Sequence, residues 1–262
     1  MSDAVEIAID ERGVATVVLN RPEKHNALTP DIIAGLTETA GVLGADPNVR
    51  VVVLTGTGKS FCAGGDLTWM QKAMEADRET RNAEARKLAT MLQAMNTMPK
   101  PLIGRVQGQA YGGGLGMASV CDVAIGVTGA RFGLTETKLG VIPATIAPYI
   151  VARMGEAKAR RVFMSSRVFD AEEAVTLNLL AKAVAPKDLD AAVEAEVASY
   201  LKCAPGAVAD AKKLARALGP VIDDTVIEMT VQSLVERWEG EEIREGISAF
   251  FEKRKAKWVV EG

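Results

Sequence analysis

The chain has 262 residues, of which 48% are hydrophobic and 25% are charged, a composition typical of a globular protein with a large core. It contains 31 Lys and Arg residues and 34 Asp and Glu residues, so its formal net charge is −3. This weak acidity argues against a nucleic-acid partner, because surfaces that bind nucleic acid normally have a basic excess. The single histidine, His25, excludes metal centres that need two histidines, and a Ser-His-Asp triad would lack its usual GxSxG motif.

The cysteines and the apolar segments bear on cellular location. Cys62, Cys121 and Cys203 are odd in number and have no CxxC spacing, so we interpret them as reduced core thiols of an intracellular protein. No segment approaches the roughly 18 apolar residues of a membrane span. The N-terminal segment has an early acidic residue and no basic region before an apolar run, which is unlike a signal peptide. We therefore expect a cytoplasmic or organelle-matrix protein with no membrane partner.

Apolar patterns predict strands in the first half of the chain. The strand segments are residues 5–10, 14–20, 49–55, 102–106 and 123–127. The first two flank a turn at residues 11–13, which predicts a hairpin. The third is a continuous run of mainly β-branched residues, typical of a strand that is buried on both faces in an α/β protein.

Helices are expected between and after these strands. Thr29, Pro30 and Asp31 form a strong helix start, with a capping hydroxyl, a proline at the first position and an acid in the first turn. The other helical segments are residues 77–98, 115–120, 156–165, 171–177, 189–202, 207–218, 227–238 and 243–254. After residue 144, only residues 181–184 have a strand pattern.

This order of elements predicts the organisation of the domains. We expect a strand-and-helix core over residues 1–200 and a helical C-terminal region over residues 201–262. No linker or repeat separates the two, so we expect one continuous architecture.

One glycine segment resembles part of a nucleotide-binding motif. The sequence GTGKS at residues 56–60 is similar to the end of a P-loop, but the full motif needs glycine at position 53, where Val53 lies inside a predicted strand. The next residues, FCAGGDL, continue as another glycine turn instead of a helix. We therefore interpret residues 56–60 as a turn after a strand.

Two further glycine turns could supply backbone donors. They are FCAGGDL at residues 61–67 and AYGGGLGM at residues 110–117. Glycine lets bare N–H groups come close to a ligand, and two turns that face each other would offer two donors to one oxygen, as in an oxyanion hole. The alternative is that these glycines serve only tight packing of a helix on a strand.

A glutamate in an apolar segment is the candidate acid or base. Glu136 has Phe132, Leu134 and Leu139 as sequence neighbours, and burial among them would raise its pKa and suit it to general acid–base catalysis. The alternative is an exposed glutamate beside Lys138.

These segments, in this order and spacing, resemble the crotonase (enoyl-CoA hydratase/isomerase) superfamily over nearly the full chain. The matching segments are LNRPEKHNAL (19–28), AGGDL (63–67), YGGGLG (111–116), CD (121–122), FGLTETKLGVIP (132–143) and FFEKRK (250–255). The resemblance implies an α/β fold with a ββα spiral core and a helical C-terminal trimerisation region. It also implies an acyl-CoA thioester substrate, enolate chemistry, no metal, and no cofactor apart from the CoA of the substrate.

The resemblance also implies roles for individual residues. The backbone N–H groups of Gly65 and Gly113 would form the oxyanion hole, and Glu136 would be the catalytic carboxylate. Substrate and CoA contacts are expected at Lys24, Ala27, Leu28, Ala63, Gly64, Asp66, Leu67, Gly112, Gly116, Phe250 and Lys253. The last two would come from a neighbouring subunit of a trimer or a pair of trimers. Apart from the resemblance, Lys253 could equally be a solvated helix end.

One position departs from the family pattern. Hydratases of this family commonly have two glutamates, but the first position is Gly116 here. A single glutamate suits double-bond isomerisation. Hydration would need another way to position water, such as Asp66, Thr135 or a carboxylate of the substrate.

A finer resemblance favours hydration. The segments YGGGLG, RFGLTETKLGVIPATIAPY and MGEAKARR are similar to bacterial methylglutaconyl-CoA hydratases, in which glycine replaces the first glutamate and the substrate has a distal carboxylate. Arg153 and Lys138 are candidates to bind that carboxylate. An enoyl-CoA isomerase, another crotonase-type reaction and a non-catalytic acyl-CoA-binding or RNA-binding relative stay open as alternatives.

Overall fold

The main sheet follows the strands expected from the sequence. The computed structural model describes residues 4–260. A six-stranded sheet has the order β1-β2-β3-β5-β7-β10, in which only β1 and β2 are antiparallel. Its strands are β1 (Val5–Ile9), β2 (Val14–Leu19), β3 (Val51–Gly56), β5 (Leu102–Val106), β7 (Val123–Val127) and β10 (Lys182–Val184). Every residue of β3 is buried, as its β-branched run predicted.

A second sheet was not expected. Four strands of three residues each form it in the order β4-β6-β8-β9, and only β8 and β9 pair antiparallel. They are β4 (Ser60–Cys62), β6 (Gln109–Tyr111), β8 (Arg131–Gly133) and β9 (Val168–Asp170). The expectation of a single strand after residue 144 was therefore wrong, because β9 is too short for a period-two pattern to appear. The GTGKS segment leads into β4, so it is a turn between strands.

The helices follow the predicted ones closely, with two additions. The helices are α1 (Pro30–Ala45), α2 (Leu67–Glu75), α3 (Arg78–Thr97), α4 (Gly113–Val120), α5 (Ala147–Met154), α6 (Glu156–Phe163), α7 (Ala171–Thr176), α8 (Leu189–Leu201), α9 (Pro205–Ala217), α10 (Asp224–Trp238) and α11 (Glu241–Phe251), with 3₁₀ turns η1 (Pro22–Lys24), η2 (Glu136–Leu139) and η3 (Pro186–Asp188). Thr29 caps α1 through a hydrogen bond from the Ile32 N–H, as expected. Helices α2 and α5 had not been predicted.

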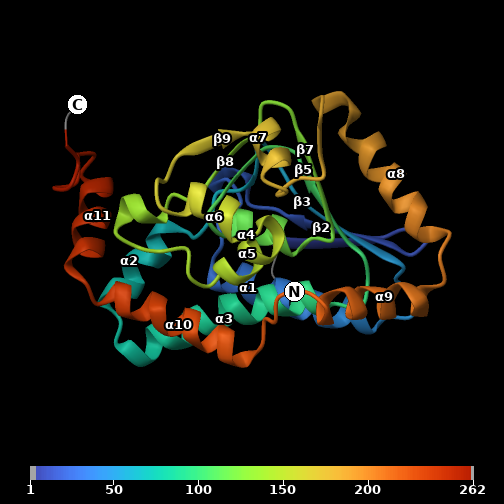
Figure 1. Cartoon of the computed structure of the whole chain (residues 1–262), viewed down its shortest axis with the longest axis horizontal. Coiled ribbons are helices and arrows are strands. Elements are labelled where there is room, and N and C mark those ends of the chain that lie inside the picture. Colours follow the sequence, from blue (N-terminus) through green and yellow to red (C-terminus); the bar gives the residue numbers. More distant parts are fainter. Residues whose placement is uncertain (1–3, 261–262) are drawn as a thin grey trace.

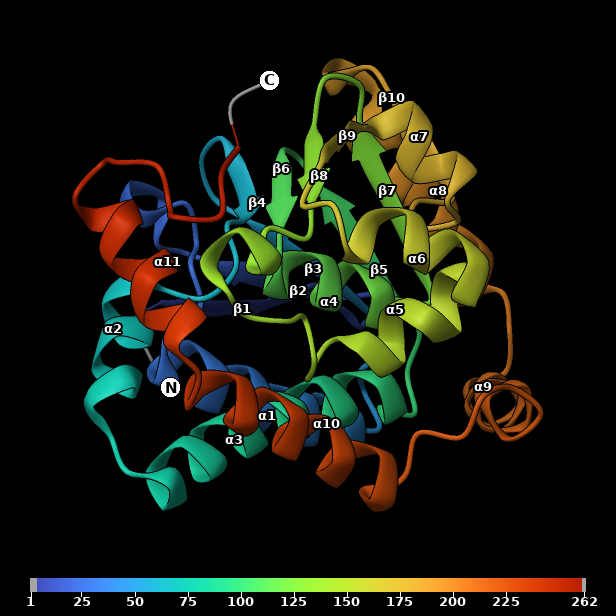
Figure 2. The same cartoon turned by 60° about the vertical axis from the view of Figure 1, so that its left-hand side comes forward.

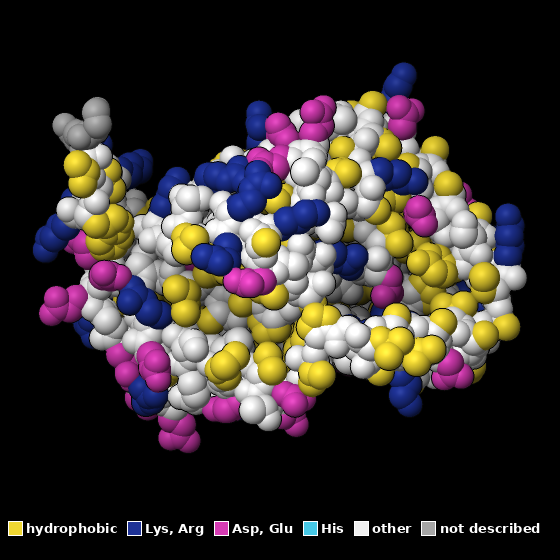
Figure 3. Space-filling model, in the orientation of Figure 1, with side chains coloured by type: hydrophobic (Ala, Val, Ile, Leu, Met, Phe, Trp, Pro, Cys, Tyr) yellow, Lys and Arg dark blue, Asp and Glu magenta, His cyan; other side chains and the backbone are white. Residues whose placement is uncertain are grey.

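The helices form layers around the sheets. Helix α8 packs against β3, β5 and β7, on the side away from α4 in Figure 1. Helices α1 and α10 both pack against α3, and α10 and α3 lie side by side along the lower edge of Figure 1. The C-terminal region therefore contacts the core through α10. Helix α9 has no buried residue, and hydrophobic side chains gather over it in Figure 3.

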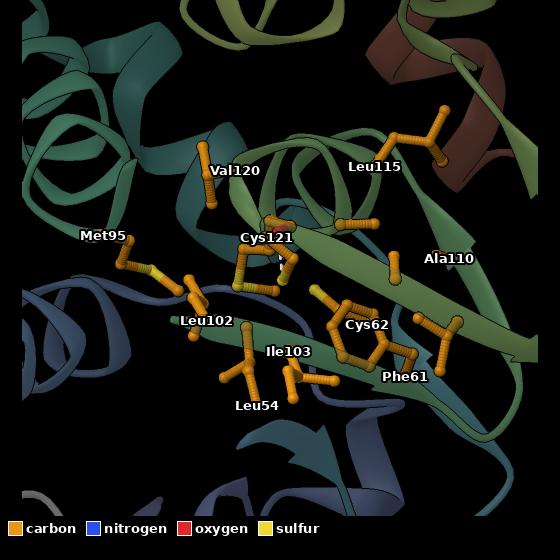
Figure 4. Packing of buried hydrophobic residues seen from close by; sticks show 14 of the residues in the cluster. Leu54, Phe61, Cys62, Met95, Leu102, Ile103, Ala110, Leu115, Val120 and Cys121 are labelled. Atoms are coloured by element: carbon orange, nitrogen blue, oxygen red, sulfur yellow. Dashed lines mark hydrogen bonds between the residues drawn. The ribbon is translucent and has the colours of Figure 1, made fainter. Parts of the chain in front are cut away.

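The core lies between the two sheets and α4. Figure 4 shows Phe61 and Cys62 of β4 packed close to Leu54 and Ile103 of the main sheet, with Cys121 at the end of α4 nearby. Burial raises the pKa of Cys62 and of Cys121 to about 12, so both are inert thiols.

Two further expectations concern Cys203 and the absence of membrane-spanning segments. Cys203 is exposed, so the expectation of three core thiols was wrong for this residue, which follows α8 in a surface turn. Within residues 4–260, no helix is both long and apolar enough to cross a bilayer.

Candidate active site

The two glycine turns face each other, as the sequence suggested. Gly64 and Gly112 have φ values of +91° and +47°, which glycine adopts without strain. A Cβ atom on Gly64 would lie 3.0 Å from the Tyr111 carbonyl oxygen and 3.6 Å from the Gly112 Cα, and one on Gly113 would lie 3.8 Å from the Gly64 Cα. The backbones of the two turns thus touch, because neither carries side chains at the contact.

Each turn has a backbone N–H at the cavity without a protein acceptor. The Leu28 N–H donates to the Gly64 carbonyl at 2.7 Å, and the Asp66 N–H donates to the Leu28 carbonyl at 2.9 Å. In this parallel pairing the intervening Gly65 directs its own N–H away from Leu28. Gly113 is the first residue of α4, where N–H groups have no partner within the helix. No acceptor within residues 4–260 is recorded for either N–H.

The carboxyl group of Glu136 lies beside these turns. Glu136 begins η2, and its Oε1 lies 2.9 Å from the position that a Cβ on Gly112 would take. Its Oε2 is fully buried and has no hydrogen-bond partner in the described residues. Burial raises the pKa of Glu136 to about 7, and backbone hydrogen bonds from Glu136 itself and Thr135 offset only part of this effect. The alternative of an exposed glutamate beside Lys138 was wrong.

Gly65, Gly113 and Glu136 line one cavity of about 120 Å³. Helices α2, α3 and α10 and the loop after η2 supply the rest of its wall, which is mainly apolar. These further lining residues include Leu28, Trp69, Met70, Arg81, Glu84, Leu88, Ile142, Thr145, Ile146, Leu234 and Trp238. Most come from segments that the sequence had not linked to the site. On α3, the spacing of residues 81, 84 and 88 places them on one helix face. This spacing is the sequence signal that could have linked them to one site.

The position of the missing first glutamate is filled from across the cavity. A Cβ on Gly116 would lie 2.6 Å from Cγ2 and 3.0 Å from Cβ of Ile146, and 3.6 Å from Cδ2 of Leu92. Ile146 thus occupies the space that a side chain at position 116 would need. Of the two glutamate positions in the family pattern, only Glu136 carries a carboxylate in this cavity.

Comparison with known proteins identifies the family. The model of the family described as enoyl-CoA hydratase/isomerase matches residues 10–260. The chain belongs to the enoyl-CoA hydratase/isomerase family. It is 34% identical over 255 residues to a Thermus thermophilus protein named as a candidate enoyl-CoA hydratase, a match that covers 96% of this chain and 100% of that protein. It is also 34% identical over 247 residues to (E)-benzylidenesuccinyl-CoA hydratase of Thauera aromatica, covering 92% and 93% of the two chains.

The fold agrees with the same assignment. The crystal structure of an enoyl-CoA hydratase from Mycobacterium avium superposes with a TM-score of 0.85 at 30% identity, covering 99% of this chain and 100% of that one. The resemblance seen in the motifs and the expected α/β crotonase fold are both confirmed. As a member of this family, the chain is an enzyme of acyl-CoA chemistry.

In this hydratase/isomerase chain, the predicted contact residues fall into three groups. Leu28 lines the cavity, and its Cδ1 lies 2.7 Å from the Cβ position of Gly113. The contact positions in the turns around the cavity are Ala27, Ala63, Gly64, Leu67 and Gly112. Lys24 is exposed at the end of η1, and Phe250 and Lys253 are exposed at the end of α11, away from the cavity lining.

Asp66 has a structural role in this chain. Its Oδ1 accepts hydrogen bonds from the N–H groups of Thr68 and Trp69, which caps α2, and its Oδ2 accepts from Arg21 Nη1 at 2.8 Å. Burial alone would raise the pKa of Asp66, but the hydrogen bonds from Arg21, Trp69 and Thr68 together lower it. Both carboxylate oxygens are therefore occupied. Neither Asp66 nor Thr135 lines the cavity, so neither lies where it could position water there.

The two candidates for a distal carboxylate lie elsewhere. Arg153 donates to the carbonyl oxygens of Ser119 and Asp122, and it lines a separate hollow of about 650 Å³ beside α9. Lys138 is exposed on η2. Neither side chain lines the cavity that holds Glu136.

Proposed function

We propose that the protein adds water to a short, branched 2-enoyl-CoA, such as 3-methylglutaconyl-CoA. The observation that supports this proposal is the cavity that holds two free backbone N–H groups and the carboxyl group of Glu136, whose Oε2 is buried without a partner. Such groups are the parts that thioester enolate chemistry needs. The proposed reaction requires no cofactor, because CoA is part of the substrate.

In the proposed mechanism the thioester oxygen lies between the N–H groups of Gly65 and Gly113. Both donors favour the enolate over the thioester, because the developing negative charge rests on that oxygen, and one such donor can contribute about 2.7–4 kcal/mol. Ionised Glu136 takes a proton from water while the water oxygen bonds to C3 and the double-bond electrons move to the thioester oxygen. Protonated Glu136 then returns that proton to C2, so the enzyme ends unchanged.

The size of the cavity supports a short acyl group. A dry protein cavity of about 150 Å³ holds benzene, which has six carbon atoms. The cavity beside Glu136 measures about 120 Å³, so it suits an acyl group of about five or six heavy atoms.

One observation favours an isomerase as the second candidate. Ile146 fills the space at Gly116, so no second carboxylate stands at the position where family hydratases commonly have one. A single base can move a proton from C2 to C4 and so shift a double bond without adding water.

Turnover of three substrates distinguishes the two candidates. The purified protein is given 3-methylglutaconyl-CoA, crotonyl-CoA and hex-3-enoyl-CoA side by side, with Glu136→Gln as the control. Loss of the conjugated enoyl absorbance, with the mass of one water added, supports the hydratase, and preference for the glutaconyl substrate supports the branched acyl group. Gain of conjugation from hex-3-enoyl-CoA without hydration of either other substrate would overturn the hydratase in favour of the isomerase.

The C-terminal region is proposed to act in assembly and in CoA binding. Phe250 and Phe251 are 50% and 45% exposed and pack edge to face at the end of α11, next to Lys253. Exposed aromatic rings beside a lysine suit contact with a second subunit and with CoA phosphates. We expect a trimer or a pair of trimers by light scattering, and a monomeric mass would contradict this part of the proposal.

A further inference from the structure

The cavity has two charged residues at one end of an otherwise mainly apolar wall. Arg81 and Glu84 stand three residues apart on α3, so they share one helix face, and both line the cavity. We propose that Arg81 binds a carboxylate at the far end of the acyl group and so selects dicarboxylic acyl-CoA substrates. This inference rests on the proposed function in one respect only, namely that the acyl group occupies this cavity.

The contacts of Arg81 fix its guanidinium and leave one end free. Its Nε donates to the Ala73 carbonyl at 2.8 Å and its Nη2 donates to the Met74 carbonyl at 2.7 Å, both in the last turn of α2. Nη1 has no recorded acceptor, and no carboxylate within residues 4–260 forms an ion pair with Arg81. The Nη1–Nη2 end therefore remains able to bind a carboxylate through two parallel hydrogen bonds. The side chain is already ordered by α2, so little entropy is lost on binding.

Arg81 enters the cavity from the end away from α4. Figure 2 shows the start of α3 below α2, and α4 and the turn η2 farther up in the molecule. Arg81 and Glu136 thus line the same cavity from two separate elements.

The negative charge of Glu84 opposes the binding of an anion, and the positive charge of Lys87 offsets that of Glu84. Glu84 Oε1 accepts a hydrogen bond from Lys87 Nζ at 2.6 Å, while its Oε2 is buried without a partner. Asp77, four residues before Arg81, also interacts electrostatically with it, so Asp77, Arg81, Glu84 and Lys87 together carry a charge of −1 + 1 − 1 + 1 = 0. Of the two cations, Arg81 is the one that lines the cavity.

Binding of unreactive acyl-CoA molecules tests this proposal. Glutaryl-CoA and hexanoyl-CoA are saturated and of similar length, but only glutaryl-CoA ends in a carboxylate. By calorimetry we expect the wild type to prefer glutaryl-CoA by at least tenfold. Arg81→Met should weaken glutaryl-CoA binding about 10- to 100-fold, as for a lost hydrogen-bonded charge pair, and should change hexanoyl-CoA binding by less than threefold. Arg81→Lys, which keeps the charge without the fork, should give an intermediate loss.

Glu84→Gln is the matched control on the same helix face. Because it removes the opposing charge from the cavity, we expect it to tighten glutaryl-CoA binding. Equal weakening of both ligands by Arg81→Met, or loss of glutaryl-CoA binding in Glu84→Gln alone, would overturn the proposal. The proposed function fails separately: absence of hydration with the glutaryl-CoA preference intact would reject the hydratase and leave the role of Arg81 standing.

Discussion

Two hollows of the molecule differ in the pairing of their charged groups. The hollow beside α9 measures about 650 Å³, against about 120 Å³ for the cavity at Glu136. In the larger hollow the charged groups have partners: Lys212 pairs with Asp122 at 2.8 Å, Arg153 donates to two carbonyl oxygens, and Arg216 donates to Asn96 Oδ1. In the smaller cavity, two backbone N–H groups and the Oε2 atoms of Glu84 and Glu136 have none, whereas the larger hollow has one such atom, the neutral Ser119 Oγ, among the described residues.

This difference shows where the chemistry lies. Buried polar groups are nearly always hydrogen-bonded in folded proteins, and leaving one unpaired costs stability. A site that holds several unpaired polar groups together therefore lowers the stability of the free protein, and a ligand that pairs these groups restores it. The volume of a hollow does not show whether its polar groups are paired.

The largest expected effect comes from the carboxyl group of Glu136, whose Oε2 is unpaired. In Glu136→Gln, turnover should fall by at least 10²-fold, the lower end for loss of general acid–base catalysis, because glutamine cannot accept the proton. The shape of the side chain is kept, so the melting temperature and CoA binding should be close to those of the wild type. Steady-state kinetics with calorimetry check both points. Turnover within threefold of the wild type would remove Glu136 from the mechanism.

The pH dependence should follow the same carboxyl group. Burial raises the pKa of Glu136 to about 7, so the group is protonated below that pH and ionised above it. Since the ionised form is the base, kcat/KM should fall about tenfold per pH unit below pH 7 and level off above it. A profile that is flat between pH 5 and 8, or that falls as the pH rises, would show that another group controls the reaction.

Replacing Gly116 should lower stability more than replacing a glycine whose Cβ position has open space around it. Gly116→Ala places a methyl group against Ile146, and such overpacking typically costs about 1–3 kcal/mol. Gly41 on α1 has no atom within 4 Å of its Cβ position, so Gly41→Ala is the matched control and should be neutral or slightly stabilising. Denaturant titration measures both, and equal effects would contradict the contact with Ile146.

A substitution in the larger hollow should lower stability and leave turnover nearly unchanged. Lys212→Met removes the partner of Asp122, and we expect a loss of about 1.5–3 kcal/mol in the free energy of unfolding, as for a charged hydrogen bond. Turnover should stay within twofold of the wild type, because no group there faces the acyl cavity. A large loss of turnover without unfolding would mean that the hollow takes part in the reaction.

The long elements could be predicted from the sequence, and the short ones could not. The buried run of β3 and the capped start of α1 each contain enough residues for a period or a cap to be recognised. The three-residue strands of the second sheet offer no period. Helix α2 starts directly at the capping residue Asp66, inside a segment interpreted only as a glycine turn.

The site was predicted where it depends on motifs and missed where it depends on tertiary contacts. Gly65, Gly113 and Glu136 stand in recognisable segments, and the structure places them in one cavity. Ile146 reaches the same cavity from the loop of residues 143–146 just after the Glu136 segment, and Arg81 reaches it from a helix that is distant from the three motifs. Their roles depend on how α3 and the loop pack, which no local pattern encodes.

The most direct test of the account measures the polarisation of a bound thioester. Butyryl-CoA labelled with ¹³C at the thioester carbonyl is bound to the wild type and to Glu136→Gln, and isotope-edited infrared spectra give its stretching frequency. We predict the same shift to lower frequency, relative to free butyryl-CoA, in both proteins, since the donors are the backbone N–H groups of Gly65 and Gly113. A frequency equal to that in water, with the ligand bound, would contradict the oxyanion hole on which the account depends.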